Sequence, residues 1–206
     1  MTAESNLTAI VLGAGRSTRM GHDKNRLDLD GEPALARVLR SLRAASVNRI
    51  VCVLAPVQNA LRRAVDLRAV TCAINPDPRA GQTSSIRIAA QNVPAGTDLV
   101  LLCPVDVPLF EAEDVSALVA AFADRRSGES IVVPSHDGRR GHPALFTRDV
   151  VAEFGALGDD EPEYVVVRRD PARVRHVERS NAWLVRDLDT PEDLAAAQAY
   201  LRSLKG

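Results

Sequence analysis

The sequence predicts an α/β fold in three layers, with a mostly parallel sheet covered by helices on both faces. Short apolar runs rich in β-branched residues alternate along the chain with segments of helical periodicity, as in repeated βαβ units. A length of 206 residues suits one such domain with a sizeable core. The expected strands cover 7–12, 49–55, 69–75, 98–103 and 130–134.

Apolar residues at helical spacing mark the segments that cover this sheet. They comprise Leu35, Val38, Leu39 and Leu42 in one segment, and Val115, Leu118, Val119 and Phe122 in another. A further helix is expected from Thr147, and a last one after Pro191. Because no repeat, low-complexity tract or linker interrupts the chain, we expect a single domain over 1–206, with residues 1–6 flexible.

The composition excludes several classes of partner. The chain has 26 basic and 27 acidic residues and only seven aromatic ones, so it predicts neither nucleic-acid binding nor attraction to an anionic membrane. The first residues, MTAESN, lack the features of a signal peptide, and no apolar run approaches the roughly 18 residues of a membrane span. The three cysteines match no metal or redox spacing. These observations predict a cytoplasmic protein.

The connection after the first strand is unusually long. It holds about 20 residues, GAGRSTRMGHDKNRLDLDGE, before a helix that begins near Pro33, whereas such loops usually have about two to six. Its glycines let the backbone approach a ligand, and its side chains include Arg16, Arg19, Lys24 and Arg26. Because the loop follows a parallel strand, it lies at the edge of the sheet where ligands bind. We therefore expect a polyphosphate site.

This loop matches neither of the two commonest phosphate motifs. The dinucleotide fingerprint requires glycine at position 18, which is Thr18 here, so an NAD-dependent oxidoreductase is disfavoured. The Walker A motif requires four residues between its first glycine and Gly-Lys, but five separate Gly15 from Gly21, and Asn25 follows Lys24. The loop is therefore neither of the two commonest phosphate-binding loops.

Read as a whole, LGAGRSTRMGHDK resembles the L-[AG]-[AG]-G-x-S-x-R-M-G-x-x-K signature of nucleotidyltransferases with a Rossmann-like, nucleotide-diphospho-sugar transferase fold. The resemblance continues in order through NPDPRAGQTSSI at 75–86, LLCPVDVPLF at 101–110, GRRGHPALF at 138–146 and DLDTPEDL at 187–194. Within that superfamily the chain looks most like the cytidylyltransferases and guanylyltransferases that complete the molybdenum cofactor.

The resemblance implies transfer of a nucleoside monophosphate from CTP or GTP to a phosphorylated small-molecule acceptor, with release of pyrophosphate. It implies Lys24 and Arg19 as catalytic residues, and Asp106 and Asp189 as ligands of Mg²⁺ or Mn²⁺. It implies His142 as an acceptor-binding residue, and a partner in molybdoenzyme maturation. The nucleotide-binding residues that it implies are Leu12, Gly13, Ala14, Gly15, Arg16, Ser17, Lys24, Gly81, Ser84, Ser85 and Asp106.

Several of these residues also have a purely structural interpretation. Asp189 precedes Thr190 and Pro191, which read as the start of the last helix, so it could serve in capping. Asp106 could be a turn residue between two prolines, the serines after Gly81 could cap a helix, and His142 could be a turn residue beside a hairpin. Lys24 stands out because the sequence has only one other lysine, Lys205, and the ammonium is a more compact charge than a guanidinium.

The choice of nucleotide and acceptor rests on finer features. Ala14 and the TSSI and GHPALF segments resemble cytidylyltransferases, whereas His22-Asp23-Lys24 resembles guanylyltransferases, and on balance CTP is favoured. A GDDEPE segment replaces the GDxGxR of the cytidylyltransferases, which leaves a sugar phosphate or another small phosphate open as acceptor. Asn25 and Arg26 stand where the resembling families often have two apolar residues after the loop lysine. The alternative to an enzyme is an accessory protein of cofactor maturation that binds a nucleotide but does not turn it over.

Overall fold

A computed structural model describes residues 6–15, 23–56, 59–158 and 161–205, and the structural statements below concern these residues. The main sheet has eight strands in the order β10-β7-β9-β6-β1-β4-β5, with β8 paired to β7. The strands are β1 (Leu7–Gly13), β4 (Arg49–Leu54), β5 (Val70–Ile74), β6 (Leu99–Pro104), β7 (Ile131–His136), β8 (Arg139–Arg140), β9 (Ala144–Thr147) and β10 (Val174–Glu178). A separate antiparallel pair, β2 (Asp28–Leu29) and β3 (Glu32–Pro33), lies in the long connection.

The predicted strands are all present, each with ends within two residues of the expectation. The neighbouring pairs β1–β4, β1–β6, β4–β5 and β7–β10 are parallel, whereas β9 runs antiparallel to β6 and β7. The mostly parallel sheet is therefore confirmed, although β9 and β10 were not predicted. Asn6, expected to be flexible, exchanges hydrogen bonds with Asp98.

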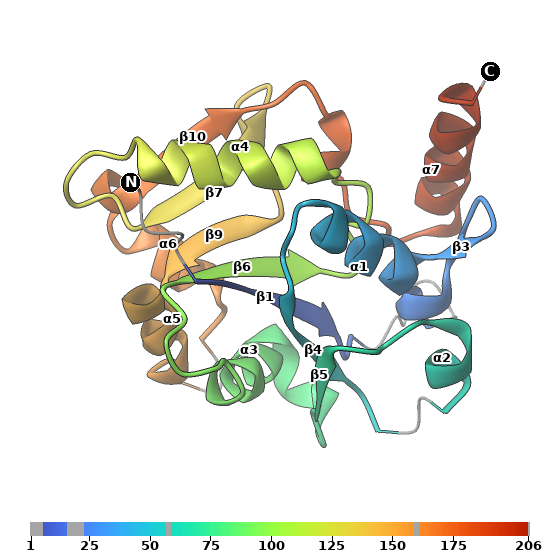
Figure 1. The fold of residues 1–206 in the computed structure, drawn as a ribbon, viewed down its shortest axis with the longest axis horizontal. Coiled ribbons are helices and arrows are strands. Elements are labelled where there is room, and N and C mark those ends of the chain that lie inside the picture. The colour runs from blue at the N-terminus through green and yellow to red at the C-terminus, as the bar shows by residue number, and fades with distance from the viewer. Residues whose placement is uncertain (1–5, 16–22, 57–58, 159–160, 206) are drawn as a thin grey trace.

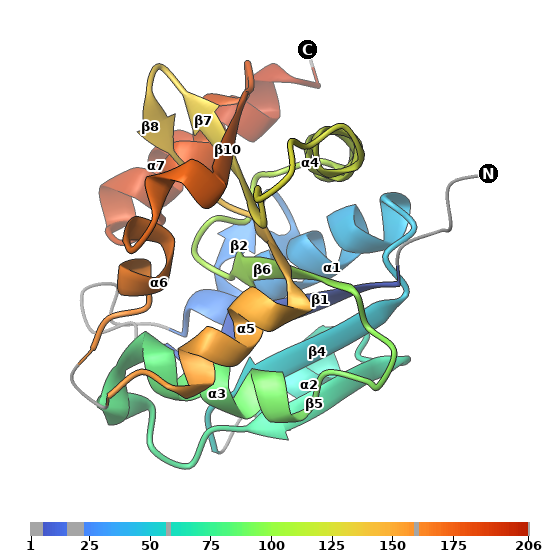
Figure 2. The same cartoon turned by 90° about the vertical axis from the view of Figure 1, so that its left-hand side faces the viewer.

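Helices cover both faces of the sheet, as the apolar periodicity predicts (Figures 1 and 2). One face carries α1 (Ala34–Ala44) and α4 (Ala112–Ala123), and α2 (Asn59–Ala64) adds Leu61 to the same core. The other face carries α3 (Gly81–Gln91), α5 (Arg148–Gly155) and α6 (Tyr164–Arg168). The last helix, α7 (Pro191–Ser203), packs against β2. The described helices include none long and apolar enough to cross a bilayer.

The strand β1 shows how the sheet separates two cores. Its side chains alternate, so Ala9 and Val11 join the core under α1 and α4, while Ile10 and Leu12 join the core under α3 and α5. From β1 the chain continues to β4 on one side, and β6 later pairs with its other side. Such a reversal opens a crevice at the carboxyl ends of the strands, where open α/β sheets bind ligands.

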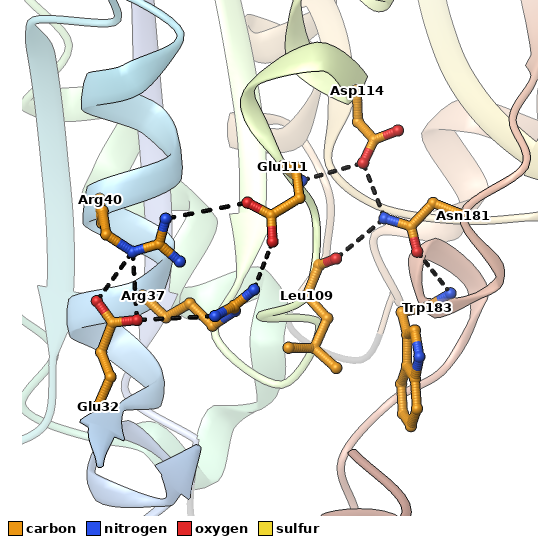
Figure 3. A network of polar contacts seen from close by, with 8 residues as sticks. All are labelled: Glu32, Arg37, Arg40, Leu109, Glu111, Asp114, Asn181 and Trp183. Atoms are coloured by element: carbon orange, nitrogen blue, oxygen red, sulfur yellow. Dashed lines mark hydrogen bonds and ion pairs between the residues drawn. The ribbon is translucent and has the colours of Figure 1, made fainter. Parts of the chain in front are cut away.

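Residues 181–189, here called the strap, run across this edge before α7 and include the 3-10 turn η4 (Ala182–Val185). Asn181 donates to the Leu109 carbonyl at 3.0 Å and to the Asp114 carboxylate at 2.8 Å (Figure 3). Farther along the strap, the Leu188 N–H donates to the Asp106 carbonyl at 2.8 Å. The strap is thus bonded at both ends to the segment that follows β6.

The Asp114 carboxylate is the buried centre of the network in Figure 3. Besides Asn181, it accepts hydrogen bonds from the Glu111 N–H and from Arg179 Nε, each at 3.0 Å. Glu111 also pairs with Arg37 of α1, which extends the network to the first helix. A buried carboxylate is tolerated because several donors surround it.

The middle of the strap lies against the backbone of the segment between β8 and β9. The His142 N–H donates to the Leu184 carbonyl at 2.8 Å. A Cβ added to Gly141 would lie 2.1 Å from the same carbonyl oxygen, well inside van der Waals contact. Only glycine permits this close approach of the two backbones.

Replacing Gly141 by alanine should therefore force a backbone shift. We expect Gly141→Ala to lower the free energy of unfolding by about 3 kcal/mol, measured by urea denaturation. Gly155→Ala is the matched control, because its Cβ would meet open space at the end of α5. The control should be neutral or slightly stabilising; equal losses in both variants would contradict the close-contact explanation.

Removing the Asn181 side chain should loosen the strap. The alanine variant loses three hydrogen bonds, including the one from the Trp183 N–H to Asn181 Oδ1, and leaves Asp114 short of a donor. We expect Asn181→Ala to cost about 2–3 kcal/mol in urea denaturation. Asn92→Ala, at an exposed asparagine, should cost about 0.5 kcal/mol or less, and a similar loss there would refute the role of the network.

Candidate active site

A cavity of about 360 Å³ opens at the carboxyl ends of β1 and β6, at the reversal point described above. It is bounded by the end of β1, the start of α3, the segment after β6 and the side chain of Lys24. The lining residues are Leu12, Gly13, Ala14, Gly15, Lys24, Pro78, Arg79, Gly81, Gln82, Ser85, Pro104, Val105 and Asp106. Most of the residues expected to bind nucleotide therefore surround one cavity.

Three of the expected residues, Arg16, Ser17 and Arg19, lie outside the described part of the chain. Ser84 is described but does not line the cavity. Its hydroxyl donates to the Gly81 carbonyl at 2.7 Å and accepts a hydrogen bond from Asn75 Nδ2. Ser84 therefore serves the first turn of α3, which agrees with the structural interpretation given for it.

The start of α3 is held against β5 by a buried asparagine. Asn75 is 1% exposed, and its Nδ2 donates to the hydroxyl groups of Ser84 and Ser85 at 2.9 Å each. Its Oδ1 accepts a hydrogen bond from the Asp77 N–H. Asn75 was not singled out from the sequence, although it begins the NPDPRAGQTSSI block. It fixes the direction in which the first turn of α3 faces the cavity.

Lys24 occupies the centre of the site. It belongs to the 3-10 turn η1 (Lys24–Arg26), and its Nζ lies 3.0 Å from Asp106 Oδ2 and 2.5 Å from Asp189 Oδ1. Its side chain is only 12% exposed, so solvent screens these ion pairs little. Burial alone would lower the pKa of Lys24, but the charges and hydrogen bonds of Asp106 and Asp189 outweigh it and raise the pKa. Lys24 is thus a fixed cation at neutral pH.

The structure also distinguishes Asp189 from the residues that cap α7. Thr190 Oγ1 accepts a hydrogen bond from the Asp193 N–H, and the Asp193 carboxylate accepts one from the Thr190 N–H, which completes a capping box. The Asp193 carboxylate also accepts from the Asp189 N–H. The Asp189 carboxylate is directed instead toward Lys24.

A third carboxylate adds to the negative charge of this region. Burial and repulsion by Asp106 and Asp189 raise the pKa of Asp187, whereas Lys24 and Arg139 act in the opposite direction. Three acidic side chains thus influence one another around the single ammonium of Lys24. These four side chains carry a net negative charge, which a further cation beside them would reduce.

The geometry of Asp106 and Asp189 fits a magnesium ion. Their oxygen atoms converge on one small cation, the Lys24 ammonium, and carboxylate oxygens are the hard donors that Mg²⁺ prefers. Within the described ranges, the histidine, cysteine and acidic residues form no group of three or more that could hold a metal. Mg²⁺ is commonly bound by one or two carboxylates together with substrate phosphates and water, so two protein ligands suffice.

A second cavity, of about 700 Å³, lies on the other side of β6, next to β7 and β9. Its floor is apolar, with Phe146 and Phe154 in edge-to-face contact, and its lining includes Arg139, Arg140 and Arg168. The guanidinium of Arg168 lies 4.4 Å from the centre of the Tyr164 ring, which lines the same cavity. This combination suits an anionic ligand that has an apolar or aromatic part.

His142 lines this second cavity rather than the first. Burial lowers its pKa, although the nearby Asp106 charge and the Leu102 backbone oppose that effect, so the imidazole is neutral at pH 7. Its buried Nδ1 has no hydrogen-bond partner among the residues that the structure describes. His142 therefore offers a polar atom beside the cavity, close enough to Asp106 to sense its charge.

The sequence reasoning missed several residues that line the two cavities. Arg79 lines the first, while Arg139, Arg140, Tyr164 and Arg168 line the second. The GRRGHPALF block contained a signal for two of the arginines, because Arg139 and Arg140 lie within three residues of His142. Nothing in the sequence placed α6 beside that block, because the helix is short and the contact is made between segments far apart.

Comparison with known proteins agrees with this arrangement. A family model described as a MobA-like NTP transferase domain matches residues 9–177. A probable molybdenum cofactor guanylyltransferase of Opitutus terrae is 30% identical, over 92% of this chain and 93% of the relative. A phosphoenolpyruvate guanylyltransferase of Rubrobacter xylanophilus is also 30% identical, over 96% of this chain and 88% of the relative.

The fold agrees with solved structures as well. The Rv0371c protein of Mycobacterium tuberculosis H37Rv is 25% identical and superimposes with a TM-score of 0.84, covering 97% of this chain and 100% of that one. A second structure of Rv0371c, aligned at 23% identity with a TM-score of 0.81 over 96% of this chain and 100% of that one, is a complex with manganese.

These findings confirm the resemblance to nucleotidyltransferases that the sequence blocks indicated. They do not support the preference for CTP, because the two relatives described here are named guanylyltransferases. The family model covers most of the chain and includes the end of β1, Lys24, Asp106 and His142. The chain therefore belongs to the MobA-like NTP transferase family.

Proposed function

We propose that the protein is a Mg²⁺-dependent guanylyltransferase that transfers GMP from GTP to a phosphorylated small-molecule acceptor and releases pyrophosphate. The observation that carries the proposal is the Lys24 ammonium held between Asp106 and Asp189, at the mouth of a cavity lined by glycines. The names of the relatives favour GTP over the CTP that Ala14 indicated. The acceptor we propose is a molybdenum-cofactor precursor.

The first cavity suits the nucleotide. A triphosphate carries about four negative charges. An enzyme catalyses transfer of its nucleoside monophosphate chiefly by positioning the reactants and neutralising charge. The backbone of Gly13 and Gly15 can approach phosphate oxygens closely, and Lys24 supplies positive charge beside them. We assign Lys24 to the α-phosphate, where charge builds up as the acceptor phosphate attacks.

Asp106 and Asp189 are the residues we assign to Mg²⁺, with Mn²⁺ as a substitute. The chemistry that the bound ion supplies is neutralisation of charge on the triphosphate oxygens. The manganese complex of Rv0371c supports a divalent ion in a protein of this fold. The two carboxylates also hold the Lys24 ammonium, beside the cavity that we assign to the nucleotide.

The second cavity suits the acceptor. Its arginines can bind an anionic group, and its aromatic floor can contact a ring or another apolar part. His142 lines this cavity and is influenced by the Asp106 charge, and a neutral imidazole there can donate a hydrogen bond to the acceptor phosphate. Because the relatives include a phosphoenolpyruvate guanylyltransferase, other small phosphates, including sugar phosphates, belong among the acceptors tested.

Pyrophosphate release tests the proposed reaction directly. GTP, CTP, ATP and UTP are each incubated with Mg²⁺ and a panel that contains the cofactor precursor, phosphoenolpyruvate and sugar phosphates. We expect GTP to exceed CTP by at least about tenfold in kcat/KM with the accepted phosphate, a difference of about 1.4 kcal/mol. A preference for CTP would overturn the nucleotide assignment. Tight nucleotide binding without turnover on any acceptor would identify a nucleotide-binding accessory protein instead.

The carboxylate variants test the metal assignment. Asp106→Asn and Asp189→Asn each remove one negative ligand, so we expect kcat for pyrophosphate release to fall by about 10² or more. Binding of Mn²⁺, measured by electron paramagnetic resonance, should weaken in both variants, while the far-UV circular dichroism stays unchanged. Asp124→Asn, at an exposed aspartate, is the control. Unchanged Mn²⁺ affinity in either site variant would remove that residue from the metal site.

A further inference from the structure

We propose that Asn25 is a positioning residue that ties the Lys24 turn to the end of β1 and so holds the Lys24 ammonium between Asp106 and Asp189. The inference rests on the proposed function only where it concerns nucleotide binding. Asn25 lies outside the residues that line the first cavity. We infer that Asn25 affects nucleotide binding only through Lys24, the residue before it in the chain.

The contacts of Asn25 link two segments. Its side chain is buried, at 1% exposure of the residue, and Nδ2 donates to the Gly13 carbonyl at 2.7 Å. The same Nδ2 donates to Asp23 Oδ1, also at 2.7 Å, and Asp23 Oδ1 accepts the Asn25 N–H at 3.1 Å as the cap of the turn. One amide group thus joins both the start of the Lys24 turn and the last residue of β1.

The packing between Asn25 and Gly13 is unusually close. A Cβ added to Gly13 would lie 2.3 Å from Asn25 Oδ1 and 3.1 Å from a Leu54 methyl group. The absence of a side chain at position 13 is therefore required by the Asn25 side chain as well as by any ligand in the cavity. A side chain at position 13 would therefore displace the Asn25 amide from its present position.

The turn needs such an anchor. A 3-10 turn of three residues has little stability of its own, because few hydrogen bonds hold it. Leu27 and Leu29 anchor the following residues in the core beneath α7. Asn25 anchors the turn itself to β1, on the side that faces the cavity. Asn25 on one side and the two leucines on the other hold the Lys24 backbone in place. The positions that the Lys24 ammonium can reach are therefore limited.

The chemistry of Asn25 also indicates a role other than core stability. An apolar side chain of similar size would be cheaper to bury than the Asn25 amide. Asn25 Oδ1 has no hydrogen-bond partner among the residues that the structure describes, which carries a cost in stability. The favourable contribution of Asn25 comes from its Nδ2 donor. The two acceptors are the Gly13 carbonyl at the end of β1 and the Asp23 carboxylate next to Lys24.

The lysine content of the chain makes a direct test available. Lys24 and Lys205 are the only lysines of the sequence, so lysine labelled with ¹³C at Cε gives two resonances. In Asn25→Ala we expect the Lys24 resonance to move most of the way toward the position of free lysine, while the Lys205 resonance stays in place. Asn25→Leu restores the volume without the donor, and it should give the same result.

Two controls complete the spectroscopic test. Asn48→Ala, at an exposed asparagine before β4, should leave both resonances unchanged. The free energy of unfolding of each variant, from urea denaturation, shows whether enough folded protein is present. A Lys24 resonance that stays at its wild-type position in folded Asn25→Ala or Asn25→Leu overturns the proposal.

A double-mutant cycle tests the consequence for nucleotide binding. In the wild-type background, Asn25→Ala should raise the Kd for GTP with Mg²⁺ by about tenfold. In a Lys24→Met background the same replacement should change Kd by less than about twofold, because the residue it positions is gone. Equal losses in the two backgrounds would mean that Asn25 does not act through Lys24.

The two experiments also separate this inference from the proposed function. Failure of the wild-type protein to bind GTP with Mg²⁺ would refute the proposed function, and the resonance of Lys24 would still decide the role of Asn25. GTP binding by the wild type together with an unmoved Lys24 resonance in the variants would refute the positioning role alone.

Discussion

The ion pairs of Lys24 with Asp106 and Asp189 are the interaction on which the site depends. They join residues separated by 82 and 165 positions in the chain, so they form only when the first connection, the end of β6 and the strap meet. The low exposure of Lys24 makes the pairs strong enough to matter and costly to leave half-formed. A chain with net charge −1 can therefore contain a strongly polarised site, because opposite charges gather at one sheet edge.

The parallel sheet explains why these segments meet. The strands β1 and β6 are adjacent and parallel, so the residues that follow them emerge at the same edge. The strap reaches that edge by a different route, through the hydrogen bond between the Leu188 N–H and the Asp106 carbonyl and through Asn181. Regular strand pairing thus brings the ends of β1 and β6 together, and specific side-chain contacts hold the Lys24 turn and the strap beside them.

The sequence predicted what depends on local pattern. Buried strands and amphipathic helices each have a characteristic periodicity, which predicted the sheet and the helices that cover it. The glycine loop and the aspartates belong to recognisable sequence blocks, which predicted most of the described residues that line the end of β1 and Asp106 in the first cavity. The strand β9 was missed because it is short and antiparallel. The Ser84 hydroxyl bonds within the first turn of α3 and to Asn75, and its contact with a nucleotide stays a prediction. Asn25 was noticed only as a departure from a pattern. Its role depends on the distance to Gly13, which no local pattern encodes.

The strap also links the two cavities. Its Leu184 carbonyl contacts the Gly141–His142 backbone beside the second cavity, whereas Asp189 at its end faces Lys24 beside the first. Packed backbones without intervening side chains cannot slide past one another without loss of contact. A shift of the Gly141–His142 backbone would therefore require the Leu184 end of the strap to move as well. The shape of the second cavity and the placement of Asp189 are therefore linked through the strap, and we expect substitutions that alter one to require compensation in the other.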